Sequence, residues 1–557
     1  MTRATLPRRS DIVSSLQKNP HSDVLIIGGG INGLSTLREL SLRGITATLV
    51  ERADFGSGAS AGSSHMIHGG IRYLENGEIR LVKESLQERN RLLDNAPHYV
   101  KPLGTTIPIF STFSGILSAP LRLLMHRSIS TKERGAVLIK IGLVLYDLFG
   151  RKKGTLPAHQ FYGRKKSLAL YPELNPDLKY TAHYSDACVE NPERLTLDVV
   201  RDALAWHPTA RAVNYMEAVG RDGDDILLRD RVSGSELRHR APVVINASGP
   251  WTDLTNSGLG HPTHFMGGTK GSHIVLDNPD LYQACGGREI FFENDDGRIV
   301  LVFPIMGKVL VGTTDIPITN PDDATCTDEE VEYFFDLVGH VFPTLELSRD
   351  QIVFRYSGVR PLPAAGDLSP GVVSRDYRIV TESLGEATTL LSLVGGKWTT
   401  FRALGEHLAT DAVAALHHDT SGSSESLAIG GGEGFPRTPA ETDNWVSRHR
   451  GDIPAPRAQA LLQRYGTVAS TLLEELGARG DDALGSAPDW SRQEIEWLVA
   501  HEMVEHLVDI THRRTPLAFL GLLTAEVAEE LGQIAGKHLG WSVARKKREI
   551  QDVLSAL

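Results

Sequence analysis

Three glycines close to the start of the chain have the spacing of a phosphate-binding turn. Gly28, Gly30 and Gly33 fit G-x-G-x-x-G and follow the apolar run 24–27. The first glycine of this pattern permits a tight turn, the second lets backbone approach a pyrophosphate, and the third lets the next helix pack on the strand. The phosphates then lie at a helix N-terminus, where unpaired N–H groups and the helix dipole favour an anion.

An acidic residue completes this unit. Glu51 ends the second apolar run, roughly 20 residues after the glycines, where a carboxylate accepts hydrogen bonds from ribose hydroxyls and repels a 2′-phosphate. Strand, helix, second strand and terminal acid together predict a dinucleotide-binding βαβ unit over residues 22–52. The pattern does not separate NAD from FAD.

Two later strands also end in small residues. The run "VVINASGPW" places Ala247 and Gly249 after an apolar strand, which allows close backbone approach to a dinucleotide. The run 390–394 is followed by Gly395, Gly396 and a helix that opens with Lys397, a second helix N-terminus directed at an electron-rich group. A strand and helix so far along the chain often return to the cofactor in flavoproteins, which favours FAD.

Composition limits the class of protein. A chain of 557 residues exceeds what one hydrophobic core supports, which predicts two or three domains. The net charge of −11 argues against nucleic-acid binding. Cys188, Cys285 and Cys326 lie far apart without metal-ligand spacing, so we expect no metal site and a reducing, cytoplasmic compartment. No apolar run reaches the length of a transmembrane helix.

Residues 1–21 contain arginines and serines but no apolar core of a secretory signal. They have some features of a transit peptide, and the sequence does not decide whether they are cleaved. We favour a short amphipathic leader that packs beside the first strand.

Residues 110–166 are basic and apolar in an otherwise acidic protein. Such a stretch lies either on an anionic membrane surface, with its apolar face down, or in a helical excursion with solvated lysines. Its basic residues are Arg122, Arg127, Lys132, Arg134, Lys140, Arg151, Lys152, Lys153, Arg164, Lys165 and Lys166.

Several motifs together resemble the FAD-dependent glycerol-3-phosphate dehydrogenases of the quinone-linked, membrane-associated type. These are "VLIIGGGINGL", "SSHMIHGGIRYLE", "VVINASGPW", "KGSHIVL", "VLVGTTDIP", "YSGVRPL", "SRDY" and "GGKWTTFRALGEH". The resemblance implies an α/β fold in which a Rossmann-like FAD-binding domain of the glutathione reductase 2 and D-amino-acid oxidase (GR2/DAO) type is interleaved with an antiparallel-sheet substrate domain. We expect both domains in 22–420, a Gly/Ser-rich linker at 421–434 and an all-α domain at 435–557.

The same resemblance implies oxidation of sn-glycerol 3-phosphate to dihydroxyacetone phosphate by hydride transfer to flavin N5, with electrons passed to quinone. Arg360 and His273 are the expected catalytic residues, as phosphate clamp and base; a structural histidine on a strand is the alternative for His273. Arg360 is expected to bind substrate together with Arg72, Tyr73, Arg375 and Lys397. The expected cofactor-binding residues are Gly28, Gly30, Gly33, Glu51, Ser60, Ser64, His65, His68, Gly69, Ala247, Gly249, Asp315, Gly395, Gly396, Lys397 and Thr399.

The chain departs from the family pattern near residue 60. Ala59 and Ala61 stand where hydroxyl residues are frequent, and His65 stands where lysine is common. A histidine beside the flavin would change charge near neutral pH and add a pH dependence to the flavin midpoint potential. The alternative is a histidine hydrogen-bonded to backbone and remote from the ring.

These departures keep other functions open. An oxidase that uses oxygen, or a dehydrogenase of another phosphorylated polyol such as a tetritol phosphate, would share the fold. A flavin-binding protein without catalysis is a third option, against which intact Arg360, Arg375, His273 and Lys397 argue. The expected partners are a phosphorylated polyol, quinone and the inner face of a membrane, to which the protein binds peripherally; a homodimer is one option for the oligomeric state.

Overall fold

The computed structural model describes residues 5–71, 78–111, 136–150, 156–293, 299–364 and 376–555. Arg72, Tyr73 and Arg375 lie outside these ranges. So do the basic residues of 110–166 other than Lys140, Arg164, Lys165 and Lys166.

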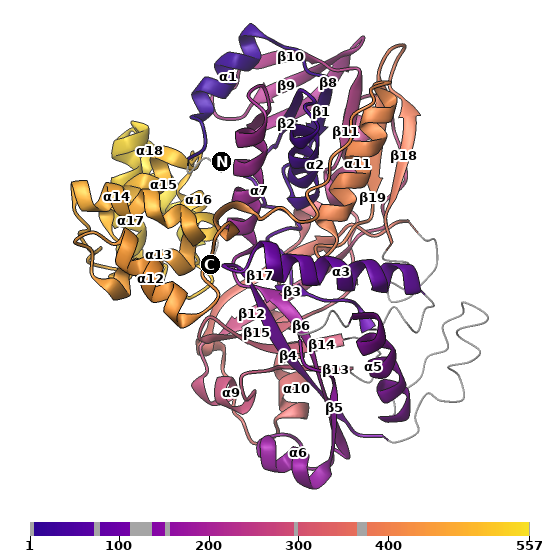
Figure 1. Ribbon diagram of the computed structural model, residues 1–557, viewed down its shortest axis with the longest axis vertical. Coiled ribbons are helices and arrows are strands. Elements are labelled where there is room, and N and C mark those ends of the chain that lie inside the picture. Colours follow the sequence, from indigo (N-terminus) through magenta and orange to yellow (C-terminus); the bar gives the residue numbers. More distant parts are fainter. Residues whose placement is uncertain are drawn as a thin grey trace.

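A six-stranded sheet forms the expected dinucleotide-binding domain (Figure 1). Its order is β18-β19-β11-β1-β2-β7, with all neighbours parallel except the edge strand β18. Each residue of β1 is buried, as its unbroken apolar run predicted for a strand covered on both faces. The strands are β1 (Val24–Ile27), β2 (Ala47–Val50), β7 (Arg211–Val213), β11 (Val243–Asn246), β18 (Arg378–Ser383) and β19 (Thr389–Val394).

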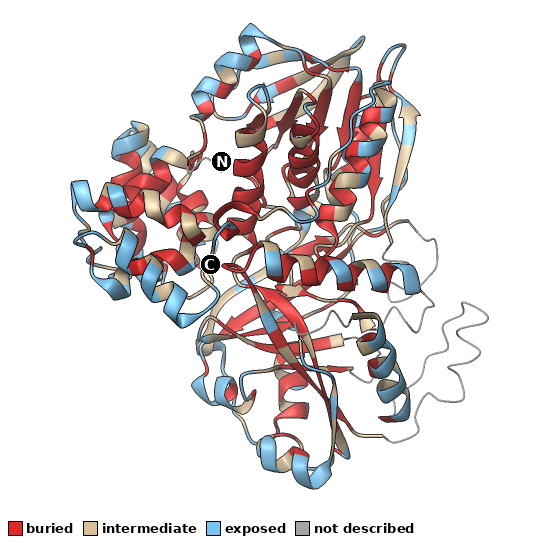
Figure 2. Cartoon of the chain, in the orientation of Figure 1, coloured by how far each residue is buried: buried red, intermediate tan, exposed pale blue. Residues whose placement is uncertain are grey.

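Helices cover this sheet, and their packed faces are buried (Figure 2). They are α2 (Ile31–Leu42), α7 (Pro192–Trp206), α8 (Thr252–Gly258) and α11 (Phe401–Ala415). A three-stranded antiparallel sheet lies beside them, made of β8 (Met216–Asp222), β9 (Asp225–Asp230) and β10 (Glu236–Arg240).

The second large sheet is mostly antiparallel and is formed by the intervening segments of the chain, so the two domains are interleaved. Its order is β16-β12-β15-β14-β13-β4-β6-β3, with β17 added on β12 and β5 on β6. The strands are β3 (Met66–Ile67), β4 (Val100–Ile109), β5 (Gln160–Gly163), β6 (Tyr180–Val189), β12 (Thr269–Leu276), β13 (Glu289–Glu293), β14 (Ile299–Ile305), β15 (Lys308–Gly312), β16 (Ile316–Pro317) and β17 (Ile352–Arg360).

Four helices accompany this sheet, and α3 lies between it and the dinucleotide-binding domain (Figure 1). They are α3 (Ile79–Asn95), α6 (Arg164–Leu170), α9 (Pro279–Ala284) and α10 (Asp328–Val341). A further helix, α5 (Ala136–Gly150), belongs to the basic stretch and packs on α3 and β6.

The C-terminal part is helical, as expected, and has its own apolar core. Its helices are α12 (Pro439–His449), α13 (Ala455–Tyr465), α14 (Ala469–Arg479), α15 (Arg492–His501), the short α16 (Leu507–Asp509), α17 (Ala525–Leu539) and α18 (Val543–Ser555). Buried ion pairs hold it to the dinucleotide-binding domain: Asp54 pairs with Arg513 and Arg514, and Glu502 pairs with Arg194 and Arg201.

One expectation about the connections needs correction. The leader helix α1 (Arg9–Lys18) packs on β7 and β10 rather than on the first strand, and Arg9 pairs with Asp230 at 2.7 Å. The Gly/Ser-rich stretch 421–434, where we expect a linker, is tightly packed. An ideal Cβ on Gly431 would lie 2.2 Å from the carbonyl oxygen of Tyr465, so glycine is present there because the backbones touch.

Candidate functional site

The predicted glycine turn brings the ends of β1 and β11 into contact. An ideal Cβ on Gly28 would lie 2.6 Å from the carbonyl oxygen of Ala247, and one on Gly33 would lie 2.0 Å from that of Gly28. Gly28 also has φ +114°, which L side chains rarely adopt. Each glycine is therefore required by a close approach, and the turn leads directly into the N-terminus of α2.

Glu51 lies at the same edge of the sheet. Its two carboxylate oxygens accept hydrogen bonds from the amides of Gly29 (2.6 Å) and Ala53 (2.8 Å). Burial raises the pKa of Glu51, and these two amides oppose that rise. Glu51 thus fixes the glycine turn itself. Ser60 lies at the start of α2, where its hydroxyl accepts the Ile31 N–H at 2.9 Å.

The second glycine pair faces the first turn of α2. A Cβ on Gly396 would lie 3.0 Å from the amide nitrogen of the Asn32 side chain. Asn32 Oδ1 and Thr400 Oγ1, at the starts of α2 and α11, are buried and have no hydrogen-bond partner among the residues that the structure describes. Unsatisfied buried polar atoms are costly, so these two indicate a bound group that supplies the missing hydrogen bonds.

Hydrogen bonds join the two loops that border this space. Trp398 Nε1 donates to the carbonyl oxygen of Ser60 at 3.0 Å. Thr399 Oγ1 donates to the His68 carbonyl at 3.2 Å and accepts the His68 N–H at 3.3 Å. Lys397 Nζ donates to Ser85 on α3 at 2.9 Å. Thus five residues expected at the cofactor or substrate, from two distant segments, lie in one place: Ser60, His68, Gly69, Lys397 and Thr399.

The expected base comes from the pairing of β12 with β17. His273 lies opposite Tyr356 in this pair, and the two rings stack with centroids 4.9 Å apart and planes at 14°. His273 Nε2 is 2.8 Å from Ser64 Oγ. Burial lowers the pKa of His273 well below its usual 6.5, and the charge of Arg360 lowers it further. The imidazole is therefore neutral at pH 7 and able to accept a proton.

The expected phosphate clamp lies at the end of the same strand pair. Arg360, opposite Thr269, places Nη1 3.1 Å from Asp315 and Nη2 2.8 Å from Thr313 Oγ1. Its side chain stays 25 % exposed, so a phosphate can reach it. Asp315, which we expect at the cofactor, also holds this guanidinium and accepts the Thr269 hydroxyl at 2.5 Å.

Sequence reasoning missed two residues here. Tyr356 covers one face of the base and anchors the loop before β3 by donating to the Ser63 carbonyl at 2.7 Å. Tyr356 and Arg360 are four apart on one strand and share a face, so the alternation of "YSGVRPL" was an available signal. Thr313 had no comparable signal, because it lies in the loop after β15 and meets Arg360 of β17 only in the folded structure.

For His65 the structure favours the alternative, a histidine hydrogen-bonded to backbone, over one that changes charge near neutral pH. His65 is 4 % exposed, its Nδ1 is 3.0 Å from the Val189 carbonyl, and burial lowers its pKa to about 4. The ring is therefore neutral throughout the physiological range. It faces away toward the C-terminal part, 5.2 Å from the Phe519 ring.

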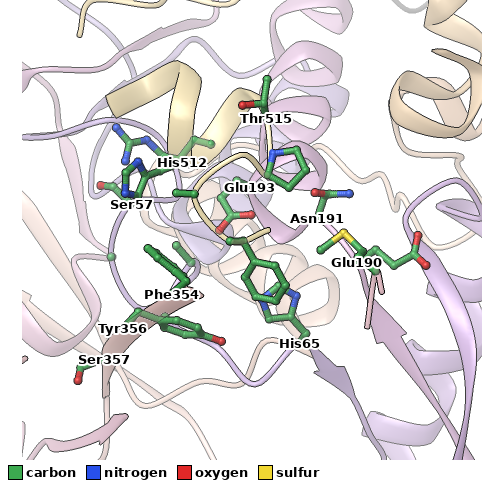
Figure 3. Close-up of a pocket in the computed structure, with 18 residues that line it drawn as sticks. Ser57, His65, Glu190, Asn191, Glu193, Phe354, Tyr356, Ser357, His512 and Thr515 are labelled. Carbon is green, nitrogen blue, oxygen red and sulfur yellow. The ribbon is translucent and has the colours of Figure 1, made fainter. Parts of the chain in front are cut away.

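A cavity of about 190 Å³ lies between loop 57–65, β17 and residues 512–519 (Figure 3). Ala61 and His65, where the chain departs from the family pattern, both line this cavity beside residues 512–519 of the C-terminal part. Glu193 points into this cavity in Figure 3, and burial raises its pKa to about 7. The phosphate clamp and the base lie outside this cavity's lining.

Comparison with known proteins identifies the class. Residues 23–409 match the family described as FAD dependent oxidoreductase, and residues 422–546 match the C-terminal domain of alpha-glycerophosphate oxidase. The chain belongs to the FAD dependent oxidoreductase family and is a flavoenzyme.

Full-length relatives narrow this assignment. The chain is 33% identical to a glycerol-3-phosphate dehydrogenase of Synechocystis sp., covering 96% of each chain. It is 32% identical to D-erythritol 1-phosphate dehydrogenase of Brucella abortus, covering 91% of this chain and 96% of that one. Within the family it belongs with the FAD-dependent glycerol-3-phosphate dehydrogenases.

A solved structure has the same fold. Glycerol-3-phosphate dehydrogenase from Bacillus halodurans, complexed with FAD, aligns with a TM-score of 0.76 at 23% identity, covering 100% of this chain and 98% of that one. This confirms the expected α/β fold with its C-terminal helical domain. The glycine turn, Glu51 and the unpaired atoms of Asn32 and Thr400 all fit FAD.

Proposed function

We propose that this enzyme oxidises the C2 hydroxyl of sn-glycerol 3-phosphate to give dihydroxyacetone phosphate. One observation carries the proposal. Arg360 of β17 has a partly exposed guanidinium that is paired with Asp315, and the neighbouring strand β12 carries the buried, neutral imidazole of His273. A small molecule with a phosphate at one end and an alcohol near the other matches these two groups. The names of the Synechocystis and Bacillus relatives agree with this substrate.

Each side chain has a task in this reaction. Arg360 binds the phosphate through its planar fork, and Asp315 with Thr313 keeps the fork in one orientation. His273 accepts the proton of the C2 hydroxyl at a ring nitrogen, while Tyr356 and Ser64 fix its ring plane. FAD supplies the two-electron acceptor when bound. Orienting the alcohol carbon relative to both groups lowers the entropic part of the barrier.

The decisive experiment is anaerobic mixing of the purified yellow protein with glycerol 3-phosphate. Loss of the flavin absorbance band within turnover time is the expected result. Glycerol itself, which lacks the phosphate that Arg360 binds, is the control and should leave the band unchanged over the same period. A band that persists with glycerol 3-phosphate contradicts the proposal.

The Brucella relative favours a second candidate, a dehydrogenase of a longer polyol phosphate. A panel of glycerol 3-phosphate, erythritol 1-phosphate and their enantiomers separates the two by kcat/KM.

We infer that quinone is the electron acceptor. Reduction of a soluble quinone without peroxide supports this, whereas stoichiometric peroxide identifies an oxidase.

We also propose peripheral binding to a membrane through α5. Its outward side chains form an apolar stripe: Val137 (38 % exposed), Ile141 (55 %), Val144 (50 %) and Leu148 (71 %). Exposed Lys140 lies 5.7 Å from the ring centroid of Phe161, which precedes the exposed basic start of α6, residues 164–166. Apolar residues flanked by cations suit an anionic lipid surface. Among the described residues, no helix is long and apolar enough to cross a bilayer.

Liposome flotation tests this surface. Ile141→Ser with Leu148→Ser should abolish binding to anionic vesicles, and Lys140→Gln with Lys165→Gln and Lys166→Gln should weaken it and reduce its salt dependence. Leu254→Ser, at another exposed leucine (54 %), is the matched control and should bind like wild type. Equal binding of all variants contradicts the proposal.

A further inference from the structure

The inner face of α5 reaches the loop that borders the flavin site. Tyr146 is 3 % exposed, and its hydroxyl makes two hydrogen bonds. The hydroxyl accepts the backbone N–H of Gly69 at 2.8 Å and donates to Asp186 Oδ1 at 2.6 Å. The same helix therefore has an exposed apolar side and, opposite to it, a polar contact with the His68–Gly69 peptide.

Strand register places the carboxylate in this contact. β3 and β6 are antiparallel, with Met66 opposite Cys188 and Ile67 opposite Ala187. Continuing this register by one residue places Asp186 of β6 beside His68. Asp186 is 1 % exposed and pairs with Arg89 of α3 at 2.8 Å. Its Oδ1 also receives the Gly69 N–H at 3.3 Å. Tyr146, Asp186 and Arg89 thus form one buried polar group, contributed by α5, β6 and α3.

Gly69 is closely fitted to this group. An ideal Cβ at Gly69 would lie 2.5 Å from the Tyr146 oxygen and 2.3 Å from Leu86 Cδ2. The preceding residue, His68, makes the two hydrogen bonds to Thr399 that are described above. The peptide is therefore held from the cofactor side by Thr399 and from the outside by Tyr146.

We propose that Tyr146 is a positioning residue, which fixes the His68–Gly69 peptide beside the flavin site through its hydroxyl and Asp186. Only the expected change in kcat rests on the proposed function, because it is measured with glycerol 3-phosphate. Without the hydroxyl, the Gly69 N–H keeps only the longer contact to Asp186, and the carboxylate loses a donor. A buried amide with a weakened partner shifts to recover its hydrogen bond, and that shift moves the loop.

Tyr146→Phe is the test, because it removes the oxygen and leaves the packed ring. We expect kcat to fall about tenfold, which corresponds to about 1.4 kcal/mol of activation free energy, because the displaced loop no longer orients the groups beside the flavin. KM should change less than about twofold, since Arg360, the phosphate clamp, is untouched. The absorbance maximum of bound FAD should shift, because the loop beside it moves.

Tyr171→Phe is the matched control. Tyr171 is also buried (4 % exposed), and its hydroxyl is 3.0 Å from Thr106 Oγ1, in a different part of the substrate domain. The melting temperatures of both variants should fall by a similar amount, but Tyr171→Phe should keep the wild-type kcat and flavin spectrum.

Two results would overturn the proposal. One is a Tyr146→Phe enzyme with wild-type kcat and flavin spectrum; the other is an equal loss of kcat in both variants, which is the signature of general destabilisation. The flavin spectrum is read without substrate. It therefore tests the role of Tyr146 even if glycerol 3-phosphate fails to reduce the wild-type protein, which is the outcome that contradicts the proposed function.

Discussion

The glycine turn at the end of β1 and the His273–Arg360 surface of β12 and β17 are built in different ways. The glycines of the turn lie within a few positions of each other, and their close contacts are with backbone atoms, of the turn itself for Gly33 and of the distant Ala247 for Gly28. The substrate surface is made by side chains from segments 64, 273, 313–315 and 356–360, joined through strand pairing. Backbone contacts tolerate no added atom, whereas side-chain contacts lose function in graded steps.

The largest expected effect is therefore in the turn. Gly33→Ala places a methyl group 2.0 Å from the Gly28 carbonyl oxygen, where neither backbone segment can yield. We expect loss of FAD binding, measured by the flavin-to-protein absorbance ratio after purification. Gly339→Ala, a helical glycine of α10 with nothing within 4 Å of its ideal Cβ, should retain full flavin content. A normal flavin ratio in Gly33→Ala would mean that the turn is adaptable.

The next effect is at the phosphate clamp. Hydrogen bonds to charged groups are worth about 1.5 to 3 kcal/mol each, so Arg360→Ala should lower kcat/KM by about 100-fold, mainly through KM. The control is Arg355→Ala on the same strand, where the side chain is 43 % exposed and pairs with Asp328. Steady-state kinetics with glycerol 3-phosphate measure both. Equal kcat/KM values for the two variants would show that Arg360 does not bind the substrate phosphate.

His273 should have an effect of about the same size, and that effect should depend on pH. A base must be neutral to accept a proton, and the pKa of His273 lies well below 6.5, so its contribution should stay constant from about pH 8 down to about 6.5 and be lost only in more acidic solution. The measurement is the ratio of kcat/KM between wild type and His273→Gln at each pH. Ionisation of the substrate phosphate cancels in this ratio. A ratio of about 100 or more is expected, and an inflection near pH 7 would exclude His273 as a buried neutral base.

The smallest effect is expected at His65, which lies between the two regions. Because its pKa is about 4, it carries no charge between about pH 6 and about pH 8. Potentiometric titrations of the flavin in wild type and His65→Gln should then superimpose over this range. A separate pH-dependent step in the wild type alone would show that His65 is charged near the flavin after all.

Much of the architecture was readable from the chain. The apolar run 24–27, the three glycines and Glu51 predicted the βαβ unit, and "LLSLVGGKWTT" predicted the returning strand β19 and helix α11. These signals are local, because a parallel strand, its turn and its helix are adjacent in sequence. The resemblance added the interleaved second sheet and the helical C-terminal domain, which no local pattern specifies.

The sequence by itself determined which residue types are present for chemistry and where the dinucleotide turn lies, since backbone geometry at glycines follows from their spacing. Only the tertiary structure decided the partners. It placed Asp315 against Arg360, His65 against the Val189 carbonyl, and Tyr146 of the basic, apolar stretch against Gly69. Each of these depends on strand register and on burial between segments tens to hundreds of residues apart, and the chain does not encode such contacts locally.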